Sequence, residues 1–587
     1  MDYQIRIEKL TLKDKTITIK FSGYAKTKSK LARPKWILYF VRGNEDRRIP
    51  LVIDTVVYQE GSWYFGGTYE YLLDCLFWKI DKQRQDIQVY LNCQMGDYYE
   101  EKISQDLTPE ELETDSDSYL FQAEGNTWRI SVLSSKKNEH NMYRPGKGIR
   151  LYRGFSFVLC LILSPWFFAT AALAEKGYVP YASVRARNGR SPKRRIAGDI
   201  NARIMMLSGY KISPMEAKVT ILNWMFWFAK HRKIKTNSVG FISVRRNDLS
   251  GNMEFVYEKL KEKGNLDFNV FLPGKEVAQM SLRELHRAAV LCAVSKVIIL
   301  DEYTSFLYRL DLKPETKVFQ LWHACGAFKT FGYTRLGKPG GTVQESPNHK
   351  NYDYVTVSSE NVRIWYAEGF GIPTSKVYAT GVPRTDIFFD EEYKKKTQKA
   401  FFEKYPACRG KKIILFAPTF RGNVRKEAYY PMKKFPLDSF LEHISKEYMV
   451  IIKHHPFIRE KHPVPEKYQD RVLDLSAESE LNDLLFITDL IITDYSSLVF
   501  EASLLNLPML FYTFDLQEYI EKRDFYFNYK SFVPGKLCYT FQELVNAVVK
   551  KDFEQEKVKT FAEKYFDRLD GNSSQRVADL VCRAVEE

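Results

Sequence analysis

The strongest constraint on the fold comes from short apolar runs that alternate with helical patterns between residue 239 and the C-terminus. Runs rich in β-branched residues occur at 239–244, 268–272, 297–300, 318–321, 354–357 and 377–380, and a second series occurs at 413–417, 449–452, 490–493 and 509–512. Helical patterns fall between them, as at 253–263, 282–294, 393–405 and 496–505. This alternation predicts α/β architecture with parallel sheets that are covered on both faces.

The alternating stretch is too long for one such sheet, because domains usually hold about 100–200 residues. We therefore expect a pair of doubly wound α/β domains at 238–392 and 393–587. Ligands of doubly wound sheets bind at the carboxyl ends of the strands. The predicted ligand site thus lies between the two domains, in the loops that follow the strands.

The first zone, residues 1–141, shows a different pattern, in which apolar and polar residues alternate. Half-buried strands are predicted at 4–7, 16–21, 36–41, 51–53 and 87–91. The acidic stretch 105–117 is predicted to be a loop. Short strands with few helical patterns are typical of a small antiparallel sandwich. We expect a small all-β accessory domain without chemistry of its own.

The region 142–237 combines apolar aromatic segments with basic flanks. Residues 154–174 carry no charge but contain Pro165, and residues 219–228 run into a basic stretch. Such segments suit attachment to an anionic membrane surface, although buried linker helices or a true span stay open as alternatives. The side chains expected at the membrane are aromatic or basic: Trp166, Trp224, Trp227, Arg194, Arg195 and Lys233.

The amino-acid composition limits the kinds of binding partner to expect. Lys and Arg total 88 against 73 Asp and Glu, a net charge of +15 that favours nucleotides, polyphosphates or anionic lipid as partners. The chain contains no known nucleic-acid motif, so we expect no nucleic-acid partner. The 8 cysteines are scattered without metal-ligand spacing, which predicts reduced cytosolic thiols and no metal site. The polar N-terminal residues predict no secretory signal.

Histidines follow two of the predicted strands. His323 comes directly after the run 318–321, where an imidazole with an ordinary pKa of about 6.5 suits proton abstraction; a helix-capping role is the alternative. Lys453, His454 and His455 follow the run 449–452. Three cations at one strand end favour a nearby anion such as phosphate, and adjacent histidines point to opposite sides of an extended chain, which disfavours a metal pair.

Two further strand ends carry groups suited to phosphate. Thr419 and Arg421 follow the run 413–417, and the guanidinium offers a planar fork for phosphate oxygens. Asp494, Ser496 and Ser497 end the run 490–493 just before a helix, whose N-terminus attracts phosphate. Glu501 follows one turn later and suits a ribose hydroxyl. GxxxxGK[ST] and GxGxxG sequences do not occur, which weakens ATP-type and NAD binding.

Several short motifs, in this order and spacing, carry a family resemblance. They are Gln-Leu-Trp-His at 320–323, Tyr-Asp-Tyr-Val-Thr-Val-Ser-Ser-Glu at 352–360, Gly-Val-Pro-Arg-Thr-Asp at 381–386, Ala-Pro-Thr-Phe-Arg at 417–421, His-Pro at 455–456 and Thr-Asp-Tyr-Ser-Ser at 493–497. From about residue 239 onward the chain resembles the CDP-glycerol glycerophosphotransferase family of wall teichoic acid enzymes. One departure is that many members have Trp-His-Gly-Thr-Pro, whereas this chain has Ala324 and Cys325 after His323.

The resemblance implies a GT-B-like pair of domains with the CDP donor bound in the second one. It also implies that His323 acts as the base and that His455 contacts the donor diphosphate. The implied reaction transfers ribitol phosphate or glycerol phosphate from a CDP-polyol to a lipid-linked teichoic acid acceptor, releases CMP, and needs no cofactor. The implied location is the cytoplasmic face of the cell membrane, with peripheral or monotopic attachment.

Alternatives stay open at this point. A GT-B glycosyltransferase that uses a nucleotide sugar would release UDP in place of CMP. A catalytically silent membrane scaffold would have no need of the histidines together with the segment 494–497. The choice between glycerol and ribitol, between one addition and polymerisation, and between a monomer and a homo-oligomer also stays open.

Overall fold

The computed structural model describes residues 2–132 and 214–587, apart from short gaps at 14, 28–29, 31, 44, 77–83, 97, 104–105, 117–118, 339–340, 345, 347, 423–426, 461 and 478–479. The predicted apolar segment 154–174, with Trp166, and the basic residues Arg194 and Arg195 lie outside the described residues. Contacts divide the chain into two units. One comprises Met1–Lys136, Gly251–Gly264 and Phe319–Arg583; the other comprises Lys137–Ser250, Asn265–Val318 and Ala584–Glu587.

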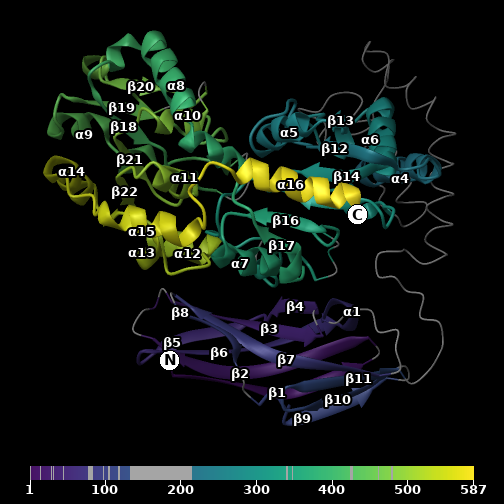
Figure 1. Cartoon of the computed structure of the whole chain (residues 1–587). Helices are drawn as coiled ribbons and strands as arrows, with labels where there is room; N and C mark the ends of the chain where they lie inside the picture. The colour runs from purple at the N-terminus through teal and green to yellow at the C-terminus, as the bar shows by residue number, and fades with distance from the viewer. Residues whose placement is uncertain are drawn as a thin grey trace, which may run out of the picture. The chain divides into compact units, whose positions relative to one another are not determined.

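The N-terminal strands form two sheets around one apolar core that includes Trp36, Phe40 and Trp128 (Figure 1). One sheet has the order β5-β6-β2-β1-β9, built from Thr55–Gln59, Ser62–Leu72, Thr16–Lys26, Tyr3–Lys13 and Glu111–Asp115. The other has the order β10-β11-β7-β3-β4, built from Tyr119–Glu124, Thr127–Val132, Arg84–Met95, Pro34–Arg42 and Glu45–Pro50. β8 (Tyr98–Ile103) pairs with β7, and the short helix α1 spans Leu73–Leu76.

The sandwich corrects two sequence predictions. The acidic stretch 105–117 is not all loop, because β9 lies within it and pairs in parallel with β1. Lys9 of β1 forms ion pairs with Glu111 and Glu113, which explains how a charged segment joins the sheet edge. Residues 51–53 are not a strand; β4 ends just before them at Pro50.

The first α/β sheet is parallel, as the strand–helix alternation predicts. Its order is β13-β12-β14-β15-β16-β17, built from Asp267–Phe271, Lys235–Ile242, Ser295–Leu300, Lys317–Gln320, Tyr354–Val357 and Val377–Ala379. The helices that connect these strands are α5 (Asn252–Lys263), α6 (Leu282–Val294) and α7 (Glu360–Phe370). A capping box of Ser281 and Glu284 starts α6, which satisfies two backbone N–H groups at the helix N-terminus.

The second α/β sheet is also parallel and has the order β20-β19-β18-β21-β22-β23. Its strands are Val472–Asp474, Tyr448–Ile452, Lys412–Phe416, Leu490–Thr493, Met509–Tyr512 and Lys536–Cys538. Helices α9 (Leu437–His443) and α14 (Phe541–Lys550) bury one face of this sheet. The order of the strands reverses between β18 and β21, so the loops after these two strands flank the position where doubly wound sheets bind ligands.

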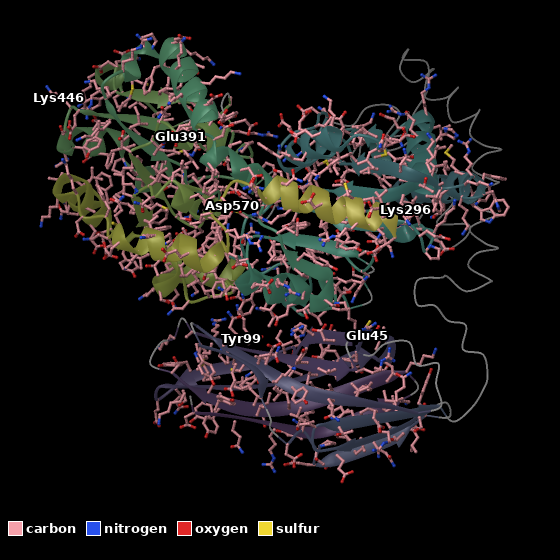
Figure 2. The ribbon with its side chains drawn as sticks, viewed as in Figure 1. Glu45, Tyr99, Lys296, Glu391, Lys446 and Asp570 are labelled. Carbon is pink, nitrogen blue, oxygen red and sulfur yellow. The ribbon has the colours of Figure 1, made fainter. Side chains whose placement is uncertain are left out.

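The chain returns to the first α/β sheet at its C-terminal end. Helix α16 (Ser573–Glu586) begins where Asp386 accepts hydrogen bonds from the backbone N–H groups of Ser573 and Ser574 at 2.9 and 2.8 Å. Gly381 adopts φ 87°, and a Cβ there would lie 2.2 Å from Ser573 Oγ, so this approach requires glycine. Asp570, which is labelled in Figure 2, pairs with Arg576 of the helix at 2.8 Å.

Among the remaining described helices of the second α/β region, α8 is the longest. Their bounds are Glu391–Lys404 for α8, Leu481–Leu485 for α10, Leu498–Leu504 for α11, Leu516–Arg523 for α12, Tyr529–Phe532 for α13 and Glu556–Tyr565 for α15.

Helix α4 (Pro214–Ala229) has one buried side and one exposed aromatic side. Val219, Leu222 and Phe226 are buried, and the helix contacts α6. Trp224 is 41% exposed and Trp227 is 55% exposed. Among the described residues, we find no helix with the length and apolar character needed to cross a membrane.

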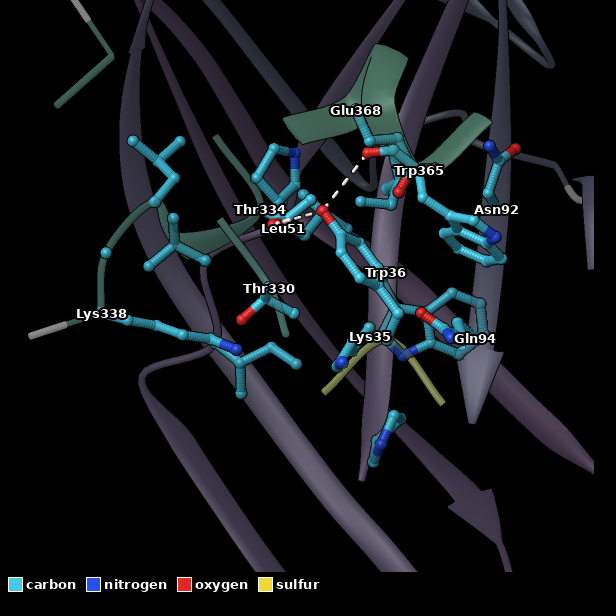
Figure 3. A pocket seen from close by; sticks show the side chains of 18 of the residues that line it. Lys35, Trp36, Leu51, Asn92, Gln94, Thr330, Thr334, Lys338, Trp365 and Glu368 are labelled. Atoms are coloured by element: carbon cyan, nitrogen blue, oxygen red, sulfur yellow. Dashed lines mark hydrogen bonds between the residues drawn. The ribbon is translucent and has the colours of Figure 1, made fainter. Parts of the chain in front are cut away.

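A cavity of about 90 Å³ lies between the sandwich and α7 (Figure 3). Lys35 and Trp36 line it from β3, and Trp365 and Glu368 line it from α7. Lys35 pairs with Asp524 at 3.2 Å. Glu368 is only 4% exposed, and burial raises the pKa of its carboxyl to about 7.

Candidate functional site

The loop that carries His323 is held in a strained conformation. Trp322 has φ 55°, in the left-handed region that a bulky residue rarely adopts. Gln320 accepts a hydrogen bond from the Trp322 backbone N–H at 2.8 Å, and Asn252 donates to the Trp322 carbonyl at 2.7 Å. The His323 side chain is exposed to solvent. The fold thus presents this imidazole at the carboxyl end of β15, as predicted from the sequence.

Arg384 connects the His323 loop to helix α11. Its Nη1 donates to the His323 carbonyl at 2.9 Å, and its Nη2 pairs with Glu501. The Arg384 and Glu501 side chains are 17% and 6% exposed, so their ion pair is shielded from water. One carboxylate oxygen of Glu501, the residue predicted to suit a ribose hydroxyl, binds Arg384, whose charge compensates the buried carboxylate.

Arg421 lies inside a cluster of carboxylates. Its Nε and Nη2 donate to the two oxygens of Asp515 at 2.6 and 2.9 Å, and its Nη1 donates to Asp494 at 2.9 Å. Thr419 donates its backbone N–H and its hydroxyl to Asp494 at 2.8 Å each. Arg421, Thr419 and Asp494, which the sequence predicts at a phosphate, bind one another in this structure and brace the loops after β18 and β21.

The segment after β21 leaves its serines at the surface of the site. Tyr495 is buried and donates to Asp515 at 2.9 Å, which anchors the turn. Ser496 is half-buried, and its hydroxyl accepts a hydrogen bond from the Leu498 N–H at 3.2 Å. Ser497 is exposed and directly precedes α11. The hydroxyls of these two serines thus stand at the strand-reversal point of the sheet.

The loop after β19 is less positively charged than its sequence suggests. His454 turns into the core, where burial lowers its pKa to about 4, so it is neutral near pH 7. Lys453 donates to the carbonyls of Leu475 and Ser476 at 3.0 and 3.3 Å, and burial lowers its pKa. Adjacent residues of an extended chain point to opposite sides, which explains why only one of the two histidines stays near the surface.

His455 is half-buried beside the rings of Phe420 and Phe457. The Phe457 N–H donates to His455 Nδ1 at 3.2 Å. In the neutral ring the proton then resides on Nε2, which makes Nε2 a hydrogen-bond donor toward an anion. Among the described residues, we find no group of three or more His, Cys, Asp or Glu side chains arranged to hold a metal ion.

A pocket of about 710 Å³ adjoins the Arg421 cluster. Phe420, Phe514 and Tyr519 give it aromatic walls, and Asp515 and Arg523 give it polar ones. This size and mixed lining are typical of pockets for small organic ligands. Sequence reasoning missed Asp515, Asn252 and Arg523. Asp515 follows the run 509–512 closely enough to be found as a strand-end residue, whereas no local signal marks the other two.

The chain is similar to proteins of one known family. The model of the family described as CDP-Glycerol:Poly(glycerophosphate) glycerophosphotransferase matches residues 224–583. The teichoic acid poly(ribitol-phosphate) polymerase of Bacillus spizizenii is 45% identical over 355 residues, which cover 60% of this chain and 57% of the relative. The teichoic acid ribitol-phosphate polymerase TarK of Staphylococcus aureus is 39% identical over 381 residues, covering 64% and 74%.

Among solved structures, the wall teichoic acid polymerase TagF matches with a TM-score of 0.53 at 19% identity. The match covers 66% of this chain and 97% of that chain. At this identity the likeness concerns the fold, which agrees with the parallel α/β sheets. The chain spans somewhat more than half the length of the Bacillus relative.

Proposed function

Because the chain belongs to the CDP-glycerol:poly(glycerophosphate) glycerophosphotransferase family, we propose that it transfers a polyol phosphate from a CDP-polyol to a teichoic acid acceptor and releases CMP. The two relatives named above are ribitol-phosphate polymerases, which favours CDP-ribitol over CDP-glycerol and polymerisation over a single addition. The expected arrangement is GT-B-like, with the donor in the second α/β domain.

One observation carries this proposal. Arg384 bonds to the His323 carbonyl and pairs with Glu501 of α11, so the backbone of the His323 loop and the helix that follows the two serines bind the same guanidinium. A base for an acceptor hydroxyl and hydroxyl donors for a phosphate are thereby held in fixed relation. Such fixed relation between reacting groups is what phosphoryl transfer requires, since its catalysis rests on positioning and charge stabilisation.

The reaction follows from these placements. The acceptor hydroxyl oxygen forms a bond to the β-phosphorus of the CDP-polyol, and its proton passes to His323. The bond between the β-phosphorus and the bridging oxygen breaks, so CMP leaves with that oxygen. His455 Nε2–H and the hydroxyls of Ser496 and Ser497 donate to the diphosphate and stabilise its charge. The donor is a substrate, and we propose no cofactor for this step.

The cytidine is expected in the pocket of about 710 Å³ beside Arg421. In this arrangement Arg421 is a positioning residue, because its guanidinium holds Asp494 and Asp515 and so fixes the pocket wall and the turn before Ser496. The aromatic walls Phe420 and Tyr519 suit a planar base.

A lipid-linked acceptor requires the protein to work at a membrane. Helix α4 exposes Trp224 and Trp227 on one side and is followed by the exposed Lys233. Indole rings favour the headgroup region and cations favour anionic lipid. We therefore propose peripheral attachment through α4 to the cytoplasmic membrane face.

The test is CMP release by the purified full chain with a lipid-linked acceptor analogue. CDP-ribitol, CDP-glycerol and a UDP-sugar are offered separately. Release of CMP from one CDP-polyol supports the proposal, whereas release of UDP alone overturns it in favour of a glycosyltransferase.

The role of His323 has its own test. His323→Ala is expected to lower kcat by about 100- to 10,000-fold, the usual contribution of a general base, with little change in CDP affinity. His323→Gln serves as the control that keeps a side chain in place. A His323→Ala enzyme with nearly normal kcat would exclude this histidine as the base.

A further inference from the structure

Lys329 lies six residues after His323, on a segment that is pinned to the second α/β region. Its backbone forms an isolated β-bridge with Phe525. The Tyr526 N–H donates to the Phe328 carbonyl at 2.9 Å, and Phe328 stacks on Phe532 with ring centroids 4.9 Å apart. The Lys329 backbone is therefore fixed relative to the loops that follow the strands of the second sheet.

Its side chain lies beside an aromatic residue of helix α12. Lys329 Nζ is 5.4 Å from the ring centroid of Tyr519, and Tyr519 stacks on Tyr495 with centroids 3.8 Å apart. Tyr495 directly precedes Ser496. On the other side, burial and then the charge of Lys329 lower the pKa of His455. Lys329 is thus near both of the loops proposed to hold the donor diphosphate.

The charge of Lys329 has no carboxylate within ion-pair distance in the described part of the chain, although it is half-buried. The nearby carboxylates already form ion pairs with other cations. Asp515 and Asp494 bind Arg421, and Asp524 binds Lys35 and Lys338. A bound anion at this position would supply the carboxylate-like counter-charge that the described residues do not provide.

We propose that Lys329 is a further donor-binding residue, which contacts the diphosphate of the CDP-polyol together with His455. The proposal rests on the proposed function and deepens it, because the segment that carries the base then also supplies a cation to the donor. The donor is held by groups from both α/β sheets, and its phosphates complete the charge balance around His455.

The test uses the purified full chain with three variants. Lys329→Ala removes the cation, Lys329→Arg keeps it, and Lys564→Ala is the matched control, since Lys564 Nζ lies 5.4 Å from the Tyr565 ring but away from His455. Calorimetry measures the Kd of CDP, a probe that needs no turnover. Histidine NMR follows the titration of His455, whose pKa is lowered by burial and by the charge of Lys329 from the facing segment.

Lys329→Ala is expected to weaken CDP binding by about 10- to 100-fold, the loss of one charge-assisted hydrogen bond, and to raise the KM for the CDP-polyol similarly. The His455 titration moves to higher pH in the same variant. Lys329→Arg keeps most of the affinity, and Lys564→Ala matches the wild type.

Unchanged CDP affinity and an unmoved His455 titration in Lys329→Ala would overturn the proposal. If the wild type releases no CMP from any CDP-polyol while CDP binding still depends on Lys329, the proposed reaction fails and the anion site stands.

Discussion

Trp322 shows how a single residue shapes the candidate site. A non-glycine residue at φ 55° is under backbone strain of about 1–3 kcal/mol, which persists only where the surroundings impose it. Here the ring of Trp322 packs against Phe331 and Phe370, with centroids 5.8 and 5.0 Å away. The strain falls one residue before the proposed base, so packing inside the domain determines where the His323 imidazole emerges.

The residue scale also gives a prediction for pH. His454 has a pKa of about 4 in the folded chain because of burial, below the ordinary value of 6.5. The folded state therefore disfavours the proton that the unfolded state binds, and stability falls as the pH drops from 6.5 to 4, by up to about 3 kcal/mol. His454→Phe should lose this acid sensitivity in urea unfolding curves measured at pH 4.5 and 7.

The exposed His443 supplies the control for that experiment. His443→Gln should retain the acid sensitivity of the wild type. An unchanged pH dependence in His454→Phe would show that protonation of another group destabilises the fold in acid.

Helices and strands could be predicted from the sequence where an apolar or helical pattern was long enough to be recognised. The runs at 354–357, 490–493 and 509–512 coincide with β16, β21 and β22. The strands β20 and β23 have three residues each, one of which is charged (Asp474 and Lys536), so no apolar run marks them. The candidate site was predictable only in part. The ends of the predicted strands indicated where His323, His455 and the serines lie, but the sequence did not reveal that Arg421 pairs with Asp515, 94 residues away.

Helix α4 carries a prediction at the scale of one element. Trp227 is 55% exposed and Phe228 is 68% exposed, so neither ring is needed to pack α4 against α6. Trp227→Ala combined with Phe228→Ser should weaken binding to vesicles that contain anionic lipid by about tenfold or more, since each ring contributes about 1.5–3 kcal/mol when buried. Vesicle co-sedimentation at constant salt measures this.

Val549 of α14 offers the matched control, because it is an apolar side chain with 56% exposure on another helix. Val549→Ser should bind vesicles as the wild type does. Equal vesicle binding by the α4 double variant and by wild type would remove α4 from the membrane contact.

At the scale of the whole molecule, the sandwich shares a buried polar contact with α7 and with the short segment that follows it. Asp46 accepts hydrogen bonds from the backbone N–H and hydroxyl of Thr374, both at 3.0 Å. Arg48 pairs with Asp46 and Glu101, and its charge partly offsets the burial of Glu368. The sandwich is therefore joined to α7 and the segment after it by ionisable and polar groups, a feature that alternating strand patterns alone do not reveal.

Glu368 makes the stability of this contact depend on pH. Its pKa is raised from 4.5 to about 7 by burial, so the folded state holds a proton that the unfolded state has lost. Stability is therefore highest below pH 4.5 for this group and falls as the pH rises to 7, by up to about 3 kcal/mol. Glu368→Gln should flatten this slope in urea unfolding curves, whereas Glu360→Gln at an exposed position of the same helix should keep it.

The anchoring of α16 on Asp386 has a consequence for how the chain is made. The sandwich uses only the first 132 residues, so its two sheets have all their strands early in synthesis. The loop around Gly381 and Asp386, by contrast, obtains its partner Ser573 only after 187 further residues have been made. Domains tend to fold in the order in which they emerge, so this loop is completed long after the strands of the sandwich.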